Sequence, residues 1–147
     1  MNQVLAFYPL LIKGTITTIE LTILGAMLAL VISFIVGLAR LSNFSVVRII
    51  AIIYLEFFRG SSAIVQMFFI YFVLPMWGIY FDAITAGVIA CGCNVGAYGS
   101  EVVRGALLAV GKEQHEASKA LNYSNYKRYR YVIIPQAIPI MIPTFGN

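Results

Sequence analysis

The longest apolar run of the chain, residues 14–39, constrains the fold more than any other feature. Glu20 is its only charged residue, and Lys13 and Arg40 bracket it. About 20 apolar residues in a helix are enough to cross the hydrocarbon core of a bilayer. We therefore predict a membrane-spanning helix over residues 14–39, with Glu20 near enough to one end for its side chain to reach the membrane surface.

The composition of the whole chain supports an integral membrane protein. Apolar residues make up 61% and charged residues 11% of the 147 positions, against roughly 45–50% and about 25% in soluble domains. A chain of this length has room for a few membrane helices and for no separate soluble domain. The net charge of +4 does not indicate nucleic-acid binding, because no basic run is interleaved with aromatic residues.

Three further spans are predicted, within one transmembrane domain over residues 1–147. An interfacial helix over about 48–58 ends in a break at Arg59 to Ser62. Spans are then expected over 61–81, 83–103 and 131–147, with Trp77 and Tyr80 as interfacial aromatics. Because the last run reaches Asn147 without a closing charge, we expect the sequence to continue beyond it.

Basic residues define the orientation of the spans. Nine of the ten lie in the segments 40–59 and 104–130, whereas the 75–82 connection contains none and carries Asp82. Lys and Arg accumulate on the cytoplasmic side of membrane proteins. Both basic segments are therefore predicted to be cytoplasmic, and the N-terminus extracytoplasmic.

The cytoplasmic segment 105–130 contains a polar stretch of helical length, Gly111 to Asn122. On a helical wheel its charged residues fall on one side, and Ala117, Ala120 and Leu121 fall on the other at i, i+3 and i+4. A short helix with small residues on one face allows another protein to approach closely. The stretch is thus either a docking surface or a solvated loop between two spans.

The segment that follows the polar stretch carries local signals for a new helix. Ser124 can cap its start. Three prolines, Pro135, Pro139 and Pro143, recur every four residues and are expected to kink it.

No pattern in the sequence predicts catalysis, a cofactor or a metal. His115 is the only histidine and has no partner in the sequence. The stretch Gly105 to Lys112 lacks the spacing and the following Ser or Thr of a P-loop. Cys91 and Cys93 fit neither a redox nor a zinc motif, and we interpret them as free, buried thiols.

Two similar short sequences lie near the membrane edge, E-F-F-R-G and E-V-V-R-G. Each places a glutamate and an arginine at i, i+3 as an expected ion pair: Glu56 with Arg59, which is followed by Gly60, and Glu101 with Arg104.

The polar residues of the third span allow two interpretations. Asn94, Tyr98 and Glu101 recur about one turn apart and are candidates for a substrate pathway. The alternative is helix packing through Gly92, Gly96 and Gly99, with the polar groups joining the helices.

Two parts of the sequence together resemble a known motif. Glu116-Ala117-Ser118-Lys119-Ala120-Leu121-Asn122, followed by Ile134-Pro135-Gln136-Ala137, is similar to the E-A-A…G…I-L-P motif of permease subunits of bacterial ATP-binding-cassette importers. Residues 54–62, 66–75 and 94–105 resemble the polar amino acid branch of that family. Asn122 replaces the motif glycine, and asparagine is the next-best residue at a left-handed helix C-cap.

The resemblance implies an all-α type I importer permease fold in the bacterial inner membrane, with three spans, a cytoplasmic coupling helix and the start of a fourth span. It implies a non-catalytic subunit whose partners are a cytoplasmic ATPase dimer, a second permease subunit, an extracytoplasmic solute-binding protein and membrane lipid. The implied ATPase-docking residues are Gly111, Glu113, Glu116, Ala117, Ala120, Leu121 and Asn122.

The missing proline after Arg59-Gly60 and the A-L-N form of the motif resemble most closely the ectoine/hydroxyectoine permease subgroup. The implied solute is an amino acid or a derived compatible solute of that kind. Two other readings stay open: an ion-coupled carrier, which would need more ionisable residues inside the membrane, and a truncated structural fragment.

Overall fold

The computed structural model describes residues 2–146, with the side chains of residues 7–146. All regular structure in this part of the chain is helical, which confirms the all-α prediction. The elements are α1 (Asn2–Ala39), α2 (Ser45–Gly60), α3 (Ala63–Phe68), the π-helix η1 (Phe69–Val73), the 3₁₀ helix η2 (Leu74–Trp77), α4 (Ala83–Ala109), α5 (Lys112–Ala120), α6 (Asn125–Arg128), the π-helix η3 (Tyr129–Ile133) and α7 (Ile134–Phe145).

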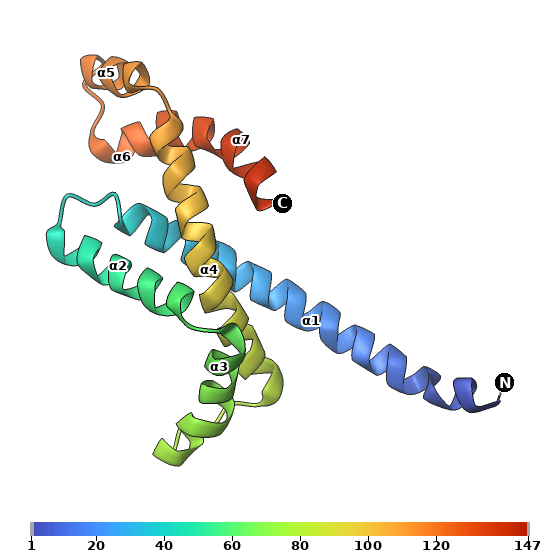
Figure 1. The fold of residues 1–147 in the computed structure, drawn as a ribbon. Coiled ribbons are helices and arrows are strands. Elements are labelled where there is room, and N and C mark those ends of the chain that lie inside the picture. Colours follow the sequence, from blue (N-terminus) through green and yellow to red (C-terminus); the bar gives the residue numbers. More distant parts are fainter. Residues whose placement is uncertain (1, 147) are drawn as a thin grey trace.

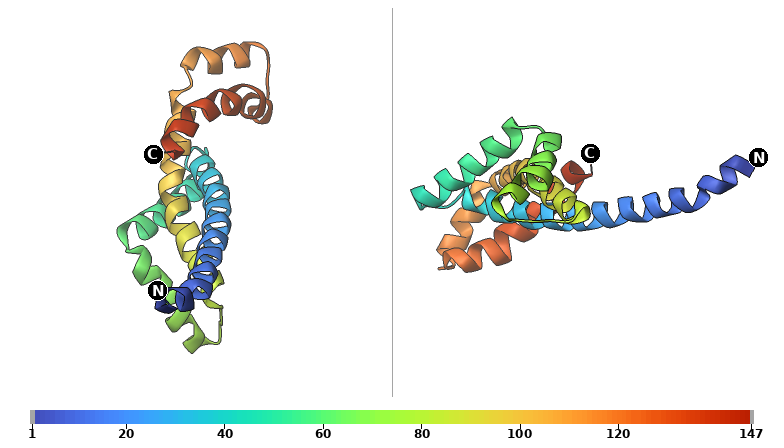
Figure 2. Two further views of the ribbon diagram at one scale, coloured as in Figure 1. Left: turned by 90° about the vertical axis from the view of Figure 1, so that its right-hand side faces the viewer. Right: turned by 90° about the horizontal axis from the view of Figure 1, so that it is seen from below.

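The two long helices, α1 and α4, pack against each other as the central pair, and α2, α3, η1 and α7 also pack against α4 (Figures 1 and 2). The N-terminal part of α1 extends away from the rest of the molecule. Helix α5 lies beyond the far end of α4, at the opposite end from η1 and η2. The polar stretch is therefore a projection from one end of the helical body.

Within the described residues, two helices are long and apolar enough to cross a membrane, α1 over Phe7–Ala39 and α4 over Ala83–Ala109. Helix α2 and the segment Ala63–Trp77 meet at 101°, and together they count as one more span if the broken pair crosses the membrane as a unit. Helix α4 thus extends past the expected end at residue 103, and α1 starts well before residue 14. From residue 125 the helical conformation is continuous to Phe145.

The expected break after Arg59 is present as two extended residues, Ser61 and Ser62, between α2 and α3. A helix end leaves backbone carbonyls without partners, which is costly away from water. Here the side-chain amide of Gln66 donates to the carbonyl of Phe58 (3.0 Å) and to the hydroxyl of Ser61 (2.7 Å). The buried Gln66 side chain therefore stabilises the bend.

Both π-helices stand immediately before a proline. The N–H of Leu74, which precedes Pro75, bonds to the carbonyl of Phe69, and the N–H of Ile134, which precedes Pro135, bonds to that of Tyr129. A proline has no N–H to continue the α-helical ladder. In both places the wider π-helical turn therefore lies just before the point where the α-helical ladder lacks a donor.

Asp82 caps the N-terminus of α4. Its carboxylate accepts hydrogen bonds from the backbone N–H groups of Ile84 and Thr85 and from the Thr85 hydroxyl. The Thr85 hydroxyl, followed by the backbone N–H groups, holds the pKa of this carboxyl below its ordinary value. Because the folded-state pKa is lowered, the cap is intact above the ordinary pKa and is lost as the pH falls through the lowered one.

Glycines on α4 allow the close approach of α1, as expected for Gly92, Gly96 and Gly99. A Cβ atom on Gly96 would lie 2.7 Å from Cγ2 of Ile32 and 3.2 Å from the carbonyl oxygen of Ala29. Ser33 adds a hydrogen bond from its hydroxyl to the carbonyl of Gly96 (3.3 Å) across the contact. Inside lipid the hydrophobic effect does not drive two helices together, so the close van der Waals contacts that small residues permit stabilise the pair instead.

We predict that Gly96→Ala destabilises the fold by about 1–3 kcal/mol, because the added methyl group overpacks the contact between α1 and α4. The measurement is the midpoint of SDS-induced unfolding in mixed micelles.

Gly105→Ala is the matched control on the same helix, because a Cβ atom on Gly105 meets nothing within 4 Å. An alanine there should stabilise the helix by about 0.5–1 kcal/mol, since glycine is a poor helix former. Equal effects of the two substitutions would contradict the packing argument.

Candidate functional site

Helix α5 begins directly after α4 and is joined to it by Val110 and Gly111. Gly111 occupies the N-cap position with extended backbone. Glu113 stands in the first turn and Lys119 in the last turn, each favourable for the helix dipole. The sequence therefore places a short polar helix at the end of α4.

One seam of α5 packs against the rest of the chain. Ser118 is only 2% exposed, and its hydroxyl donates to the carbonyl of His115 (2.9 Å). The His115 ring lies edge-on to Tyr129 of η3, with 6.4 Å between the ring centroids. The side-chain amide of Gln136 on α7 donates to that of Gln114 (3.2 Å). The contacts of His115 with Tyr129 and of Gln114 with Gln136 hold α5 against η3 and α7.

Sequence reasoning missed this seam. It treated His115 as a residue without a partner, and it named Ser118 only as part of the E-A-A-like motif. The i, i+3 spacing of His115 and Ser118 indicates that both lie on one face of the helix. Charged residues on both sides of them made this face look solvent-exposed in the sequence. In the structure Ser118 is the most buried residue of α5, where its small side chain allows close packing.

The predicted docking residues lie on the exposed part of α5 and at its ends. Leu121 is 68% exposed, although it is apolar. Gly111, Glu113, Glu116, Ala117, Ala120 and Asn122 are also exposed. Glu116 takes part in no side-chain hydrogen bond or ion pair among residues 7–146. The exposed surface combines a free carboxylate, two alanines and an apolar side chain.

Asn122 ends α5 in a left-handed conformation, with φ of 54°, as the sequence predicts. Its N–H bonds to the carbonyl of Lys119 (2.8 Å), and the N–H of Tyr123 bonds to that of Ser118 (3.1 Å). This pair of hydrogen bonds defines a Schellman motif, in which the left-handed residue reverses the chain. Asparagine thus replaces glycine with the same helix ending.

Ser124 begins the next helix, which confirms the predicted cap. Its hydroxyl accepts a hydrogen bond from the N–H of Lys127 (3.4 Å). Helix α6 then leads through η3 to Pro135, which stands at the first turn of α7. Pro135 therefore sets the π-helical turn that carries Tyr129, the contact of His115.

A second polar group of residues lies where α1, α2 and α4 meet. The Glu101 carboxylate on α4 is 2.6 Å from Nη1 of Arg40, 3.2 Å from Nε of Arg104 and 3.4 Å from Nη1 of Arg59. The guanidinium group of Arg59 also lies 5.2 Å from the centre of the Tyr98 ring. We call these five residues the arginine cluster.

The arginine cluster corrects one prediction. The sequence echo pairs Glu56 with Arg59, one turn apart on α2, but the structure pairs Arg59 with Glu101 from α4. Glu56 is exposed and forms none of the ion pairs among residues 7–146. The predicted pair of Glu101 and Arg104 is present. Glu101, partly shielded between helices, attracts Arg59 more strongly than a solvated neighbour does.

The three candidates for a substrate pathway all contact the C-terminal end of α2. The Asn94 side chain donates to the carbonyl of Phe58 (2.9 Å), Tyr98 lies under Arg59, and Glu101 binds it. Gly60, where α2 ends, is exposed and has space around it. These contacts are those expected for polar groups that join two helices, and a role in the pathway stays a prediction.

Cys91 and Cys93 are free, as predicted, but they are half-buried rather than buried. Cys91 lies against α1, where a Cβ atom added to Gly25 would be 3.8 Å from the Cβ atom of Cys91. The hydroxyl of Tyr54 donates to the backbone carbonyl of Cys93 (2.7 Å). Among the described residues, no three His, Cys, Asp or Glu side chains lie close enough to hold a metal.

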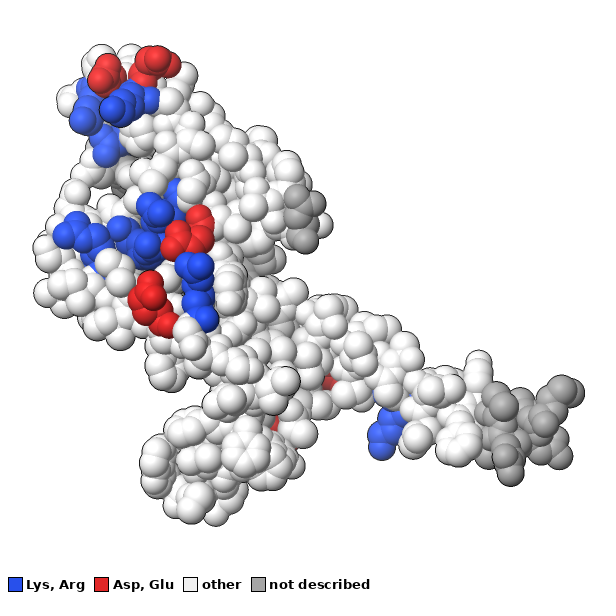
Figure 3. Space-filling model, in the orientation of Figure 1, with Lys and Arg blue, Asp and Glu red and all other residues white. Residues whose placement is uncertain are grey.

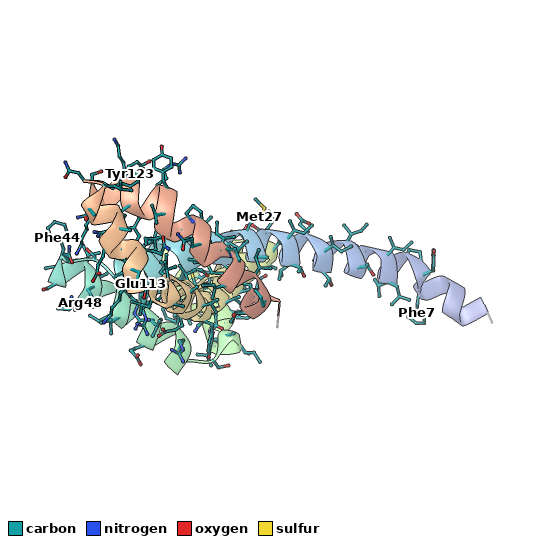
Figure 4. The ribbon with its side chains drawn as sticks, turned by 90° about the horizontal axis from the view of Figure 1, so that it is seen from above. Phe7, Met27, Phe44, Arg48, Glu113 and Tyr123 are labelled. Atoms are coloured by element: carbon teal, nitrogen blue, oxygen red, sulfur yellow. The ribbon has the colours of Figure 1, made fainter. Side chains whose placement is uncertain are left out.

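Charged side chains gather over one end of the molecule. Figure 3 shows one group of basic and acidic residues over α5 and a second where α1, α2 and α4 meet, whereas the long arm of α1 carries a single basic group. Figure 4 shows Glu113 and Tyr123 on the side that also holds Phe44 and Arg48, with Phe7 at the other end. The structure thus groups the two basic segments that the sequence places on one side of the membrane.

Comparisons with known proteins identify the class. The solved structure described as an amino acid ABC transporter with histidines superposes with a TM-score of 0.85 at 35% identity, over 99% of this chain and 68% of that chain. The fold is therefore that of an ABC transporter permease, as predicted. The profile of the family described as binding-protein-dependent transport system inner membrane component matches residues 29–147. The chain belongs to this family.

Two relatives carry names of amino acid transporters. A probable amino-acid ABC transporter permease protein of Sinorhizobium fredii is 41% identical over 92% of this chain and 59% of its own length. The glutamine transport system permease protein of Escherichia coli is 40% identical over 95% of this chain and 64% of its own length. The chain therefore spans about three fifths of these relatives. Both are named permeases, in agreement with a non-catalytic subunit.

Proposed function

We propose that the chain is the transmembrane subunit of an ATP-driven importer and that α5 is its docking helix for a cytoplasmic ATPase. The observation that carries this proposal is the division of α5 into two parts. His115 and Ser118 fasten it to the permease, while Glu116, Ala117 and Leu121 face outward. A solvated loop that only connects two spans would not be expected to have both a buried seam and a capped helix end.

The proposed assembly has two permease subunits, two ATPase subunits and an extracytoplasmic binding protein that delivers the solute. The N-terminus would be extracytoplasmic, because nine of the ten basic residues follow Ala39 in two segments on the other side. In this arrangement ATP is hydrolysed only by the partner. The family does not favour an ion-coupled carrier.

Movement of the docked ATPase would reach the membrane through two connections. Helix α5 continues directly from α4 across Val110 and Gly111, and its seam contacts η3 and α7. A push on α5 is then transmitted to the ends of two membrane segments rather than absorbed in a flexible loop. This rigid connection suits the rocking motion of alternating access.

The proposed solute is an amino acid or a small derivative of one. Names of the relatives support the amino acid class, and the narrower proposal of ectoine or hydroxyectoine rests on the R-G-S-S and A-L-N sequences. Of the pathway candidates, Tyr98 lies against the guanidinium group of Arg59 and Asn94 donates to the carbonyl of Phe58. Uptake of labelled glutamine, cystine and ectoine distinguishes these solutes.

The test of docking is site-directed cross-linking in the complete transport system. Cys91 and Cys93 are replaced by serine, and Leu121→Cys is introduced on α5. With the ATP-binding subunit co-expressed, we expect a cross-linked permease–ATPase product with a maleimide–benzophenone reagent, whose maleimide adds to the new thiol and whose photoactivated ketone inserts into a nearby C–H bond of the ATPase. Leu121 contacts little of its own chain, so the new cysteine is accessible to a partner.

Met76→Cys is the matched control, because Met76 is 81% exposed and lies at the opposite end of the molecule from α5. It should react with a soluble maleimide but form no product with the ATPase. Cross-linking from residue 76 and not from residue 121 would overturn both the docking site and the proposed orientation.

A further inference from the structure

The arginine cluster has more positive charge than it neutralises. Arg40, Arg59 and Arg104 contribute three positive charges and Glu101 one negative charge, a net +2. The guanidinium groups carry many more N–H donors than the two oxygens of one carboxylate can accept. A second anion with several oxygens would complete this arrangement.

The two outer arginines are positioned and accessible for such an anion. The side chains of Arg59 and Arg104 are 40% and 35% exposed, whereas that of Arg40 is 15% exposed. Glu101 fixes one edge of both outer guanidinium groups, and the Tyr98 ring supports the face of Arg59. An arginine held in this way loses little conformational freedom when it binds an oxyanion in the two-pronged geometry that guanidinium favours.

The position of the cluster identifies the anion. Arg40 directly follows the apolar span Phe7–Ala39, so its contact with Glu101 places the cluster at the edge of the hydrocarbon region. Exposed apolar side chains, Ile53 and Phe57, lie on α2 within two turns of Arg59. An open basic surface that adjoins lipid-facing residues at the membrane edge suits a lipid headgroup better than an enclosed solute.

We propose that Arg59 and Arg104, held by Glu101, bind the phosphate of an anionic phospholipid at the cytoplasmic face. The site rests on the proposed orientation of the subunit, which puts the 40–59 segment in the cytoplasm, but it does not depend on ATPase docking. A charge-assisted hydrogen bond from a partly exposed arginine to a phosphate contributes about 1 kcal/mol. Loss of one arginine should therefore weaken binding about five-fold.

The test measures lipid retention by native mass spectrometry of the full protein released from nanodiscs. With equal amounts of phosphatidylglycerol and phosphatidylcholine, we expect selective retention of phosphatidylglycerol. The double variant Arg59→Gln with Arg104→Gln should lower its apparent affinity about 30-fold. Near-UV circular dichroism confirms that the variant is folded.

Arg48→Gln is the matched control, since Arg48 lies three helical turns earlier on α2, is exposed and forms none of the ion pairs among residues 7–146. It loses one positive charge, as the single variant Arg59→Gln does, and should retain lipid as the unaltered protein does. Equal loss in the control and the double variant would overturn the site, because general attraction to an anionic surface would then explain binding.

Two further arms separate the possible sources of the anion. Inorganic phosphate at millimolar concentration should not displace the lipid, because a free ion lacks the acyl chains that lie against α2. Displacement by phosphate, or by a transported amino acid in place of lipid, would overturn the proposal in favour of a site for soluble anions. A failure of cross-linking at residue 121 leaves this measurement unaffected.

Discussion

Glu116→Arg is expected to abolish solute uptake while the protein inserts and folds normally. The physical reason is that the substitution places a positive charge on a docking face where a partner would hold a carboxylate. Loss of a desolvated charge pair costs about 2–5 kcal/mol, which corresponds to at least about 30-fold weaker docking. The measurement is uptake of a labelled solute by cells, with membrane content checked by immunoblotting.

Folding should survive because Glu116 has no role inside the chain. Its side chain is exposed and takes part in no hydrogen bond or ion pair among residues 7–146. The ends of α5 depend on other residues, Gly111 and Asn122. The purified variant should therefore show the same unfolding midpoint as the unaltered protein.

Arg48→Glu provides the control for charge reversal on an exposed residue of the other basic segment. It should leave uptake within about two-fold of normal, since Arg48 lies on α2 and outside the proposed docking face. Normal uptake by Glu116→Arg would refute the role of α5 as the docking helix. Stimulation of ATPase activity by the loaded binding protein should be lost in parallel with uptake.

Local features of the site were predictable because each depends on a few neighbouring residues. The left-handed end at Asn122 follows from its place after an amphipathic stretch, and Ser124 is a good N-cap in any context. The glycines of α4 are a similar case, since a repeat of small residues on one face of a membrane helix indicates a close contact. The structure confirms all three.

The remaining features require the relative positions of distant segments. Arg40 and Arg59 are far from Glu101 in the sequence, so no spacing rule joins them, and the local rule favoured Glu56 instead. The contact of His115 with Tyr129 depends on where η3 lies. The 101° bend after α2 is held by Gln66 and Asn94, which come from two other helices. Tertiary contacts decide these features, and the sequence pattern only permits them.

Glu101→Gln is expected to be the most destabilising polar substitution in the described part of the chain. The change removes the negative charge that three arginines share, and the three guanidinium groups are then left to repel one another. Removing one partner of a buried ion pair costs about 3–5 kcal/mol. Because the Glu101 side chain is 31% exposed, solvent screening should reduce the cost to about 2–3 kcal/mol.

The measurement is the unfolding midpoint in mixed micelles at low and high salt. Glu56→Gln makes the same chemical change on α2 and should cost less than about 0.5 kcal/mol, since Glu56 is exposed and forms none of these ion pairs. Equal effects of the two substitutions would show that the arginine cluster contributes nothing to stability.

The double variant Glu101→Gln with Arg40→Gln separates charge balance from packing. Arg40 is the least exposed of the three arginines and the one closest to Glu101. An unpaired charge on Arg40 therefore destabilises the folded state more than one on Arg59 or Arg104. Its removal should restore part of the stability that Glu101→Gln loses, with a coupling energy of about 1–2 kcal/mol. Purely additive losses would mean that the cluster joins α1, α2 and α4 through side-chain packing. Partial rescue would show that Glu101 stabilises the junction by neutralising charge that the three helices bring together.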